Sequence, residues 1–391
     1  MAHKPRRIAL MLDLQWPYKR HASVFAGTQQ YAEAHGWHSI IDEFVHDTLP
    51  AQRTKAIPYD GVIARANHSL AQRAARLRLP VVNVWASSPA RAQLPGVFPD
   101  FAAVGRLCAE HLLSRGFRNF ATLTPPKNVG EELLVKEMVR AVGEAGFSCV
   151  SGKYPQNPWR DLAHWRNTEQ VIKRCADLWQ LPIGVYVSHD EVGRIVAQEC
   201  QRRGLRVPAD VAIVAGQNEE TFCEHPRPSL TSMEIGYERI GYEAARMLHA
   251  LMEGGAMPTR PVLLPPQGLV VRESTDFYAV ENELVAAALA YISANSHRPI
   301  GQDDVSKAVG AETRTLQNRF RKYLGRPIVA EIRRVRIERA KRELVQSKRP
   351  LSDIARDVGF GATMRMYEVF CRELGITPSS YRKQRQMEKE L

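Results

Sequence analysis

Two stretches near the end of the chain decide the fold of its last quarter: DDVSKAVGAETRTLQNRFRKYLGRP from Asp303 and SDIARDVGFGATMRMYEVFCRELGITP from Ser352. Their first halves match at a spacing of 49 residues and their second halves at 50, so one extra residue lies in the second turn. Such an internal repeat is one supersecondary unit used twice. The matching residues are Asp304, Val305, Val309, Gly310, Phe320, Leu324 and Gly325 with Asp353, Ile354, Val358, Gly359, Phe370, Leu374 and Gly375.

Each copy predicts a short helix, a glycine turn and a second helix. Gly310 can adopt the positive φ that ends a helix sharply. Leu316 and Phe320 then recur at i, i+4 on the buried side of the second helix, as do Met366 and Phe370 in the second copy. This order of elements predicts a helix-turn-helix, whose second helix enters the major groove of DNA.

The side chains left to face outward from the two second helices suit the reading of bases. Arginine can reach guanine O6/N7, glutamine or asparagine can pair with adenine N6/N7, and a methionine can contact a thymine methyl. An ordinary helical hairpin would explain one copy equally well, but two copies in a basic segment favour DNA. The candidate base-reading residues are Arg314, Gln317 and Asn318, and Thr363, Met364, Arg365 and Glu368.

Positive charge is concentrated in the same quarter. The chain has a formal charge of +12, and residues 283–391 hold 22 Lys+Arg against 13 Asp+Glu, a net of +9, which leaves +3 for the first 282 residues. Lys and Arg that neutralise phosphates release condensed counterions, so this asymmetry indicates a polyanionic partner. A longer helix is predicted between the copies, from about Val329 to Gln346. We expect its many arginines to form a solvated face, with Glu338 and Glu343 as local partners, and some of the arginines to contact phosphate.

This segment resembles the DNA-binding domain of AraC-family regulators over about 105 residues. The resemblance lies in RIERAKRELVQSKRPLSDIARDVGF from Arg336 and ELGITPSSYRK from Glu373. It implies two helix-turn-helix units that read successive major grooves, with the base-reading positions given above. Glu312 and Gly361 stand where helix-capping residues are usual, and Asn318 replaces a common arginine. These departures leave the exact base contacts open.

The first 280 residues alternate apolar runs with amphipathic stretches, which predicts parallel doubly wound α/β sheets in two lobes. Ligands of open α/β sheets bind at the carboxyl ends of the strands, so a cleft between lobes is the natural site. The predicted strands begin at Arg7, Gly61, Val81, Phe120, Gly184 and Val211, and the predicted helices span 25–35, 104–114, 132–145, 192–203 and 240–251.

Several classes of protein are disfavoured. No apolar run approaches the ~20 residues of a membrane helix, and Asp13 interrupts the first apolar run after five residues, too soon for a secretory signal. The six cysteines form no CxxC pair and the twelve histidines show no metal spacing. No catalytic motif is present. We therefore expect a cytoplasmic protein that is not an enzyme and needs no cofactor or metal.

The α/β region is similar to LacI-type and periplasmic sugar-binding proteins from about Arg6 to Val271. The similarity lies in PDFAAVGRLCAEHLLSRGFRNFATL from Pro99, SHDEVGRIVAQECQRRGLRVPADVAIVAGQNEE from Ser188 and PSLTSMEIGYERIGYEAARML from Pro228. Such domains close on a small polar ligand, often a sugar. His189 and Asn218 depart from the usual Asn and Asp, which leaves the ligand open. The resemblance implies Asp13, Asp100, Lys136, Asp190 and Asn218 as ligand contacts, and Tyr18 and Arg20 lie close enough to join them.

The combination of both domains, joined by LLPPQGLVVRESTDF from Leu263, resembles a family of bacterial sugar-operon regulators. It implies an effector domain at 1–272 (lobe one 6–105 plus 236–268, lobe two 106–235), a linker at 273–282 and a DNA-binding domain at 283–391. The implied partners are operator DNA, D-xylose, a second copy of the chain and RNA polymerase. The expected protein is a ligand-gated activator. A repressor that responds to another sugar, a sugar-binding protein and a sugar-processing enzyme are the alternatives.

Overall fold

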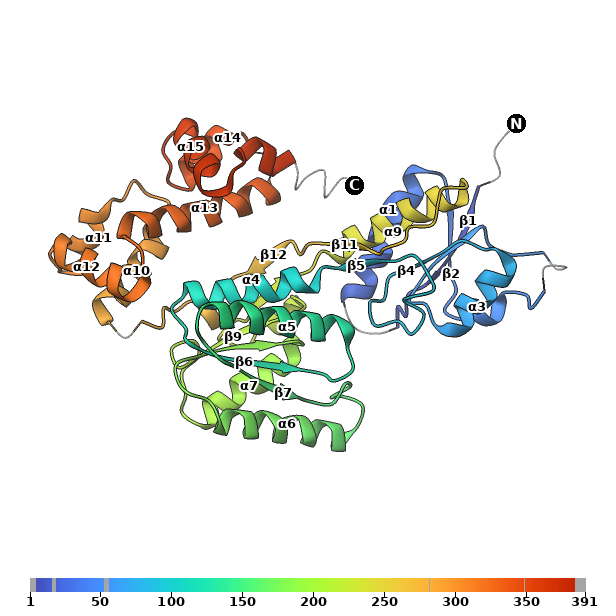
Figure 1. The fold of residues 1–391 in the computed structure, drawn as a ribbon, viewed down its shortest axis with the longest axis horizontal. Coiled ribbons are helices and arrows are strands. Elements are labelled where there is room, and N and C mark those ends of the chain that lie inside the picture. The colour runs from blue at the N-terminus through green and yellow to red at the C-terminus, as the bar shows by residue number, and fades with distance from the viewer. Residues whose placement is uncertain (1–4, 16–18, 53–55, 281, 348, 384–391) are drawn as a thin grey trace. The chain divides into compact units, whose positions relative to one another are not determined.

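The computed structural model describes residues 5–15, 19–52, 56–280, 282–347 and 349–383. The chain forms two compact units, one of Met1–Leu113 with Arg118–Asp276 and one of Ser114–Phe117 with Phe277–Leu391. Strands and helices alternate in the first unit, and the second contains only helices in its described part (Figure 1). The predicted α/β region followed by an all-α region is therefore confirmed. No helix in the described part of the chain is long and apolar enough to cross a lipid bilayer.

The first lobe of the α/β unit is built on a parallel sheet of order β2-β1-β3-β4. Apolar residues of β1 and β3 alternate between two buried faces, so helices cover both sides of the sheet, as expected for parallel strands. The strands are β1 (Arg7–Met11), β2 (His38–Ile41), β3 (Gly61–Ala64) and β4 (Val81–Asn83), and the helices are α1 (Lys19–Ala34), α2 (Val45–Thr48), α3 (His68–Leu77) and α9 (Tyr237–Met252).

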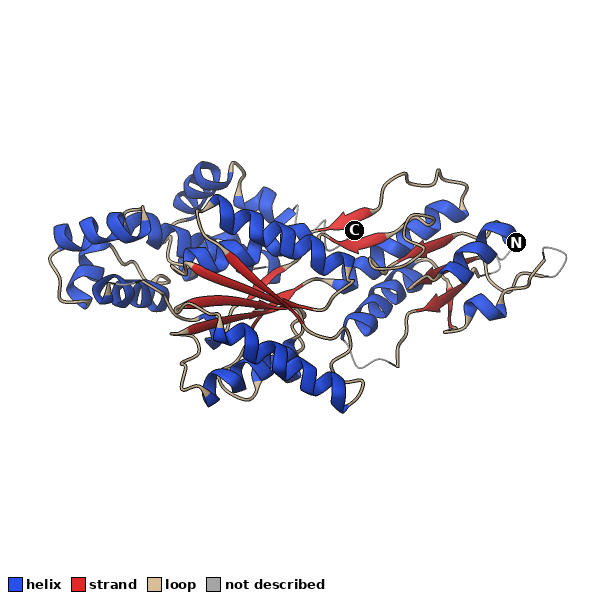
Figure 2. Ribbon diagram, turned by 60° about the horizontal axis from the view of Figure 1, so that its bottom comes forward, coloured by secondary structure: helices blue, strands red, loops and turns tan. Residues whose placement is uncertain are grey.

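The second lobe contains a six-stranded sheet of order β12-β10-β9-β8-β6-β7, in which only the β12–β10 pair is antiparallel. Figure 2 shows this twisted sheet between layers of helices. The strands are β6 (Asn119–Thr124), β7 (Cys149–Lys153), β8 (Ile183–Val187), β9 (Val211–Ala215), β10 (Thr231–Glu234) and β12 (Gly268–Val270), and the helices are α4 (Phe101–Ser114), α5 (Val129–Glu144), α6 (Leu162–Asp177), α7 (Asp190–Arg202), α8 (Glu220–Glu224) and the 3₁₀ turn η1 (Glu273–Thr275).

The chain passes between the two lobes three times. It crosses from β5 (Val97–Pro99) to α4, from β10 to α9, and from β11 (Val262–Leu264) to β12. β5 and β11 pair in parallel and form a small sheet of their own. Because all three crossings lie side by side, they can act together as a hinge for the lobes (Figure 1).

Helices α1 and α9 pack unusually closely in the first lobe. A Cβ on Gly27 would lie 1.8 Å from the carbonyl oxygen of Glu238, and one on Gly241 would lie 2.0 Å from that of Val24. Only glycine permits this approach of two backbones. The helix that was predicted to start at Phe25 begins at Lys19 in the structure. The prediction missed the first turn because that turn is polar and carries no apolar periodicity.

The second unit consists of two small cores joined by one long helix. Val305, Leu316 and Phe320 are fully buried in the first core, and Met366 and Phe370 in the second. This confirms both predicted helix-turn-helix cores. The helices are α10 (Glu283–Asn295), α11 (Gln302–Ala308), α12 (Thr313–Leu324), α13 (Ile328–Gln346), α14 (Leu351–Asp357) and α15 (Thr363–Leu374).

Candidate effector and DNA-binding sites

The carboxyl ends of the first-lobe strands hold an oriented ion pair. Asp13 follows β1 with a left-handed backbone (φ 63°), and its Oδ2 accepts a hydrogen bond from Arg65 Nη1, after β3, at 2.8 Å. The backbone N–H groups of Asp13 and Leu14 donate to the Glu43 carboxylate at 2.7 and 3.1 Å. The structure thus places Asp13 at the predicted edge, with its side chain already engaged by Arg65.

The first turn of α1 connects this lobe to the second one. The backbone N–H of Lys19 donates to Glu219 Oε1 at 2.6 Å, and its Nζ donates to Glu234 Oε2 at 3.3 Å. Burial raises the pKa of both Glu191 and Glu219 on the second lobe, and the charge of Arg20 partly opposes the rise. Arg20 Nε donates to His21 Nε2 at 3.3 Å, and His21 Nδ1 lies 2.7 Å from the Asp13 carbonyl oxygen. Tyr18 lies outside the described residues.

Asp190 begins α7 and is fully buried. Its Oδ1 accepts from Ser232 Oγ at 2.7 Å and from the Gln217 N–H at 3.4 Å, and its Oδ2 accepts from the Glu219 N–H at 2.7 Å. Both carboxylate oxygens therefore hold the loop after β9 in place. This geometry favours Asp190 as a positioning residue for the effector site.

Asn218 lies in that loop in a left-handed conformation (φ 51°). Its backbone N–H donates to Ser232 Oγ at 2.8 Å, and its Nδ2 donates to Glu234 Oε2 at 2.8 Å. Asn218 is 5% exposed, and its Oδ1 has no hydrogen-bond partner within the described chain. An acceptor buried without a partner costs free energy unless a ligand supplies the donor.

His189 caps α7 and contacts the end of the β7 strand. The Tyr154 hydroxyl lies 2.6 Å from His189 Nδ1, and both rings are buried. Burial, with the nearby charge of Arg20, lowers the pKa of His189 to about 3. The imidazole is therefore neutral at physiological pH and can exchange hydrogen bonds with hydroxyl groups.

Glu131, in the first turn of α5, belongs to the site although the sequence did not single it out. It is 7% exposed, and its Oε1 accepts from Ser188 Oγ at 2.5 Å. Burial raises the pKa of Glu131 against the opposing hydrogen bond from Ser188. A glutamate in an amphipathic helix normally points to solvent, so only the tertiary fold reveals this buried carboxylate.

Unpartnered acceptors gather at this edge of the second lobe. One side-chain oxygen on each of four residues at this edge is buried and receives no hydrogen bond from the described part of the chain. Hydroxyl groups are the ligand donors that satisfy carboxylate and amide oxygens together. The edge therefore suits a small polyhydroxylated ligand. The four atoms are Glu131 Oε2, Glu191 Oε2, Gln217 Oε1 and Asn218 Oδ1.

Two other predicted ligand residues take different positions. Asp100 caps α4, since its Oδ1 accepts from the Ala103 N–H at 3.0 Å. Lys136 is exposed on α5, five residues after Glu131 and so roughly 140° around the helix axis from it. The fold thus places Asp13 at the carboxyl edge of the first-lobe sheet and Asp190 and Asn218 at that of the second-lobe sheet, but leaves Lys136 on another face.

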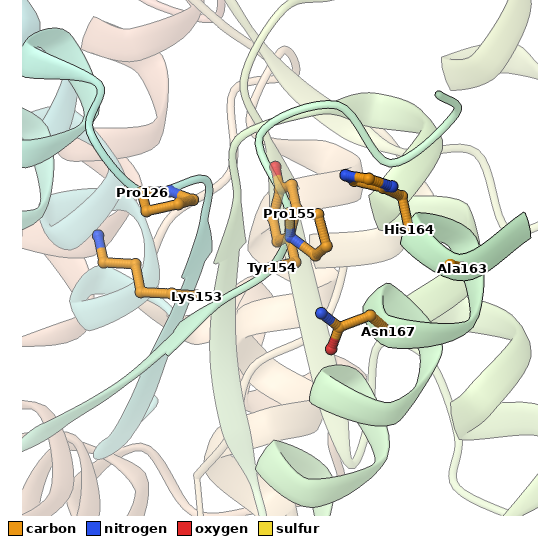
Figure 3. Close-up of a pocket in the computed structure, with 7 residues that line it drawn as sticks. All are labelled: Pro126, Lys153, Tyr154, Pro155, Ala163, His164 and Asn167. Carbon is orange, nitrogen blue, oxygen red and sulfur yellow. The ribbon is translucent and has the colours of Figure 1, made fainter. Parts of the chain in front are cut away.

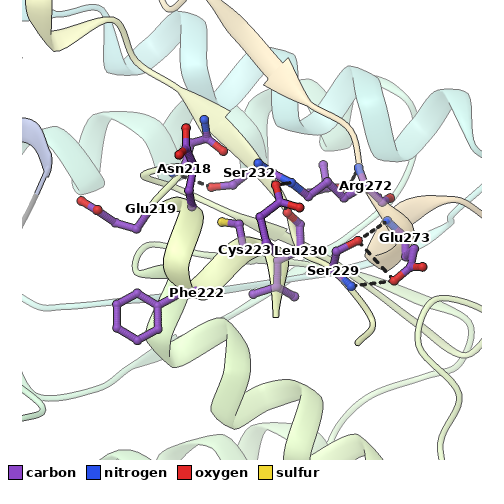
Figure 4. Close-up of polar contacts among 12 residues, drawn as sticks. Asn218, Glu219, Phe222, Cys223, Ser229, Leu230, Ser232, Arg272 and Glu273 are labelled. Atoms are coloured by element: carbon purple, nitrogen blue, oxygen red, sulfur yellow. Dashed lines mark hydrogen bonds and ion pairs between the residues drawn. The ribbon is translucent and has the colours of Figure 1, made fainter. Parts of the chain in front are cut away.

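The chain that leaves the α/β unit is fastened to the end of α8. Arg272 Nε donates to Glu224 Oε1 at 2.8 Å, and Arg272 Nη1 donates to the Leu230 carbonyl at 3.0 Å. Glu273 accepts from the N–H of Ser229 at 2.8 Å (Figure 4). The stretch 219–230 therefore begins at the loop after β9, which belongs to the effector site, and contacts Arg272 and Glu273 of the segment that leaves the α/β unit.

The second helices of the two helix-turn-helix units expose equivalent positions. Residues 313–320 and 363–370 show the same order of buried, half-buried and exposed side chains, residue for residue. Arg314, Asn318, Met364, Arg365 and Glu368 are exposed, as predicted, whereas Gln317 and Thr363 are half-buried. The equivalence also adds Thr315 and Tyr367, which the sequence reasoning missed because one turn is a residue longer.

Local bonds modify two of these expectations. Gln317 Nε2 donates to Gln302 Oε1 at 2.5 Å, which holds this side chain against α11. The residue before the first turn of α15 is Ala362 rather than Gly361, whose φ of 75° places it in the preceding turn. Ala362 and Glu312 are the N-cap residues of α15 and α12, and neither makes a capping hydrogen bond with its side chain.

The arginine-rich face of α13 is only partly a solvated surface. Arg336 Nε donates to the Ser296 carbonyl at 2.9 Å and its Nη2 to the Arg298 carbonyl at 2.8 Å. Arg334 Nη2 donates to the buried Glu331 at 2.6 Å. These arginines hold the first core together, which corrects the expectation of a free cationic face. The side chains of Glu338 and Arg342 lie outside the described ones.

Comparisons with known proteins agree with both parts. A periplasmic binding protein-like domain matches residues 109–275, and a helix-turn-helix domain matches residues 305–384. The fold and the two domain matches together define a sugar-responsive DNA-binding transcription regulator.

The chain is similar to the xylose operon regulatory protein of Escherichia coli K12, with 27% identity over 98% of each chain. The protein of that name from Haemophilus influenzae is 26% identical over 98% of this chain and 99% of its own. A solved structure described as the xylose-binding transcription activator xylR has the same fold, with a TM-score of 0.60, 24% identity and coverage of 98% of this chain and 99% of its own.

Proposed function

We propose that the chain is a xylose-dependent activator that binds paired DNA sites as a homodimer in the cytoplasm and engages RNA polymerase there. The observation that carries this proposal is the similarity, over 98% of both chains, to regulators of a xylose operon. The cluster of unpartnered oxygens on Glu131, Glu191, Gln217 and Asn218 supports it, because a pentose carries several hydroxyl donors on a small ring.

The proposed mechanism is a shift between two arrangements of the lobes. A ligand shifts such an equilibrium only through its different affinities for the two states. Hydroxyls that bind Glu131 and Asn218 from one lobe and Asp13 or Arg20 from the other favour the closed state, in which Lys19 reaches Glu219. The loop after β9 would carry that change to Arg272 and the exit segment.

On DNA, the exposed faces of α12 and α15 would both contribute contacts. Arg314, Asn318 and Arg365 supply direct contacts to base edges, each bidentate pair contributing about 1–3 kcal/mol. Tethering two units in one chain and two chains in a dimer raises effective concentration and so affinity. We also propose that the effector domain spans residues 1–272, the linker 273–282 and the DNA-binding domain 283–391. Limited proteolysis of the intact protein would test these limits.

Calorimetric titration of the full chain with D-xylose, D-ribose, L-arabinose and D-glucose tests the ligand. We expect heat of binding with D-xylose and at least about tenfold weaker binding of the others. Another preferred sugar would keep the regulator and overturn xylose. Binding by Lys136→Ala should equal that of the unaltered chain, whereas Glu131→Gln should bind more weakly.

A further inference from the structure

A second pocket opens on the second lobe beside the effector site. Its volume is about 370 Å³, within the usual range for ligand pockets. Figure 3 shows His164 and Asn167 projecting from α6 toward Tyr154 and Pro155, with Lys153 on the opposite side. The pocket lies at the carboxyl ends of β6 and β7, on the same edge of the sheet as the effector site. Its lining residues are Pro126, Lys153, Tyr154, Pro155, Ala163, His164 and Asn167.

The lining is rich in hydrogen-bond donors and contains no carboxylate. Lys153 Nζ donates to Thr124 Oγ1 at 2.9 Å, which leaves two of its three N–H bonds for another acceptor. Within the described residues, no carboxylate lies at ion-pair distance from that ammonium group. His164 Nδ1 lies 2.8 Å from Asp161 Oδ1, which fixes the ring and leaves Nε2 as its second polar atom.

Two residues connect this pocket to the effector site. Tyr154 lines the pocket with its ring and reaches His189 with its hydroxyl at 2.6 Å. Burial raises the pKa of Glu131, and the charge of Lys153 partly opposes this rise. A donor-rich pocket therefore adjoins an acceptor-rich one, and a ligand with hydroxyls at one end and an anion at the other would match both.

We infer that this pocket is an oxyanion subsite, which binds a phosphate or carboxylate group next to the sugar bound in the effector site. The inference rests on the proposed sugar-binding function for its position and on Lys153 and Asn167 for its chemistry. The Lys153 ammonium group forms charge-assisted hydrogen bonds with oxyanions, about twice as strong as neutral ones, and the Asn167 amide adds a neutral donor. The oxyanion is either a substituent of the effector or a free anion.

Calorimetry on the full chain at fixed ionic strength distinguishes these sources. The probes are D-xylose, D-xylose 5-phosphate, D-xylonate and inorganic phosphate. We expect an acidic sugar to bind about tenfold more tightly than D-xylose, or inorganic phosphate to bind by itself. The ratio of affinities is compared in Lys153→Met and in the control Lys173→Met, an exposed lysine on α6 outside the pocket.

If the protein prefers the acidic sugar, and if Lys153→Met abolishes this preference while Lys173→Met retains it, the oxyanion is a substituent of the effector. Lys153-dependent binding of phosphate alone assigns the pocket to a free anion. Equal affinities for acidic and neutral sugars without phosphate binding, or an anion preference that survives Lys153→Met, would overturn the inference. If no sugar binds but phosphate does, the proposed function fails and the oxyanion site stands.

Discussion

Arg272 Nε donates to Glu224 Oε1 at 2.8 Å and so ties the chain leaving the α/β unit to the end of α8. The other end of α8 follows Glu219, which accepts the N–H of Lys19 from the opposite lobe. One turn of helix thus lies between a lobe–lobe contact and the segment that leads to the DNA-binding unit. Arg194 of α7 stabilises this turn by donating hydrogen bonds to the backbone carbonyls of Phe222 and Cys223.

Replacing Arg272 by lysine should weaken the coupling of sugar to DNA more than either binding step. Lysine keeps the charge but cannot bond Glu224 and the Leu230 carbonyl together. Coupling free energies are about 1–3 kcal/mol, so we expect the sugar-induced change in DNA affinity to fall by fivefold or more. Arg206→Lys, in an exposed ion pair with Asp210, is the control. An unchanged sugar effect in Arg272→Lys would exclude this route.

Asp190→Asn should lower both stability and sugar affinity. One carboxylate oxygen becomes an NH₂ group in a buried site where the N–H of Gln217, the N–H of Glu219 and the hydroxyl of Ser232 all need an acceptor. An unmet buried hydrogen bond costs about 1–3 kcal/mol. Urea unfolding gives the stability and calorimetry the affinity. Wild-type values for both would show that the loop after β9 holds its shape without Asp190.

Glu191 makes stability depend on pH near neutrality. Burial, aided by the charges of Asp190 and Glu219, raises the pKa of Glu191 to about 7. Its folded pKa exceeds its unfolded one, so the folded state binds the proton more tightly. The free energy of unfolding therefore falls as pH rises from about 4.5 to 7. Glu191→Gln should match the unaltered chain near pH 4.5 and exceed it at pH 8. Parallel stability profiles of the two proteins would contradict this.

Arg314→Lys separates base reading from charge attraction. Lysine keeps the positive charge but loses the planar fork that bonds guanine O6 and N7. Affinity for the operator should fall by about 1–3 kcal/mol, while affinity for unrelated DNA and the dependence on salt stay as they were. Fluorescence anisotropy at several salt concentrations measures both. An equal loss on operator and unrelated DNA would make Arg314 a phosphate contact.

Apolar patterns predicted the parts of the fold whose burial is periodic in sequence. The runs in β8 and β9 and the pairs Leu316–Phe320 and Met366–Phe370 are all buried as predicted. The sequence analysis did not predict the polar edge strand β7 or the helix α6, in which only Thr168, Ile172 and Ala176 are buried. Their places depend on neighbours far along the chain, which a local pattern does not record.

The same distinction between local patterns and long-range packing separates the site residues that were predicted from those that were missed. The exposed helix positions such as Arg314 follow from element order alone, whereas Asp13 was assigned by the resemblance to sugar-binding proteins. Glu131 and Arg336 did not, because a charged residue on an amphipathic helix is usually solvated and only packing shows otherwise. Lys136 was chosen by position in a resembling segment, and a helical rotation places it on the exposed side.

The most direct test is DNA binding by the intact protein to its own upstream region, titrated with D-xylose and other sugars at fixed salt. Salt is held constant because phosphate contacts make affinity depend on it. We predict specific binding whose affinity or footprint changes with D-xylose alone. Specific binding that no sugar alters would contradict the effector site, and failure to bind any DNA specifically would contradict the regulator itself.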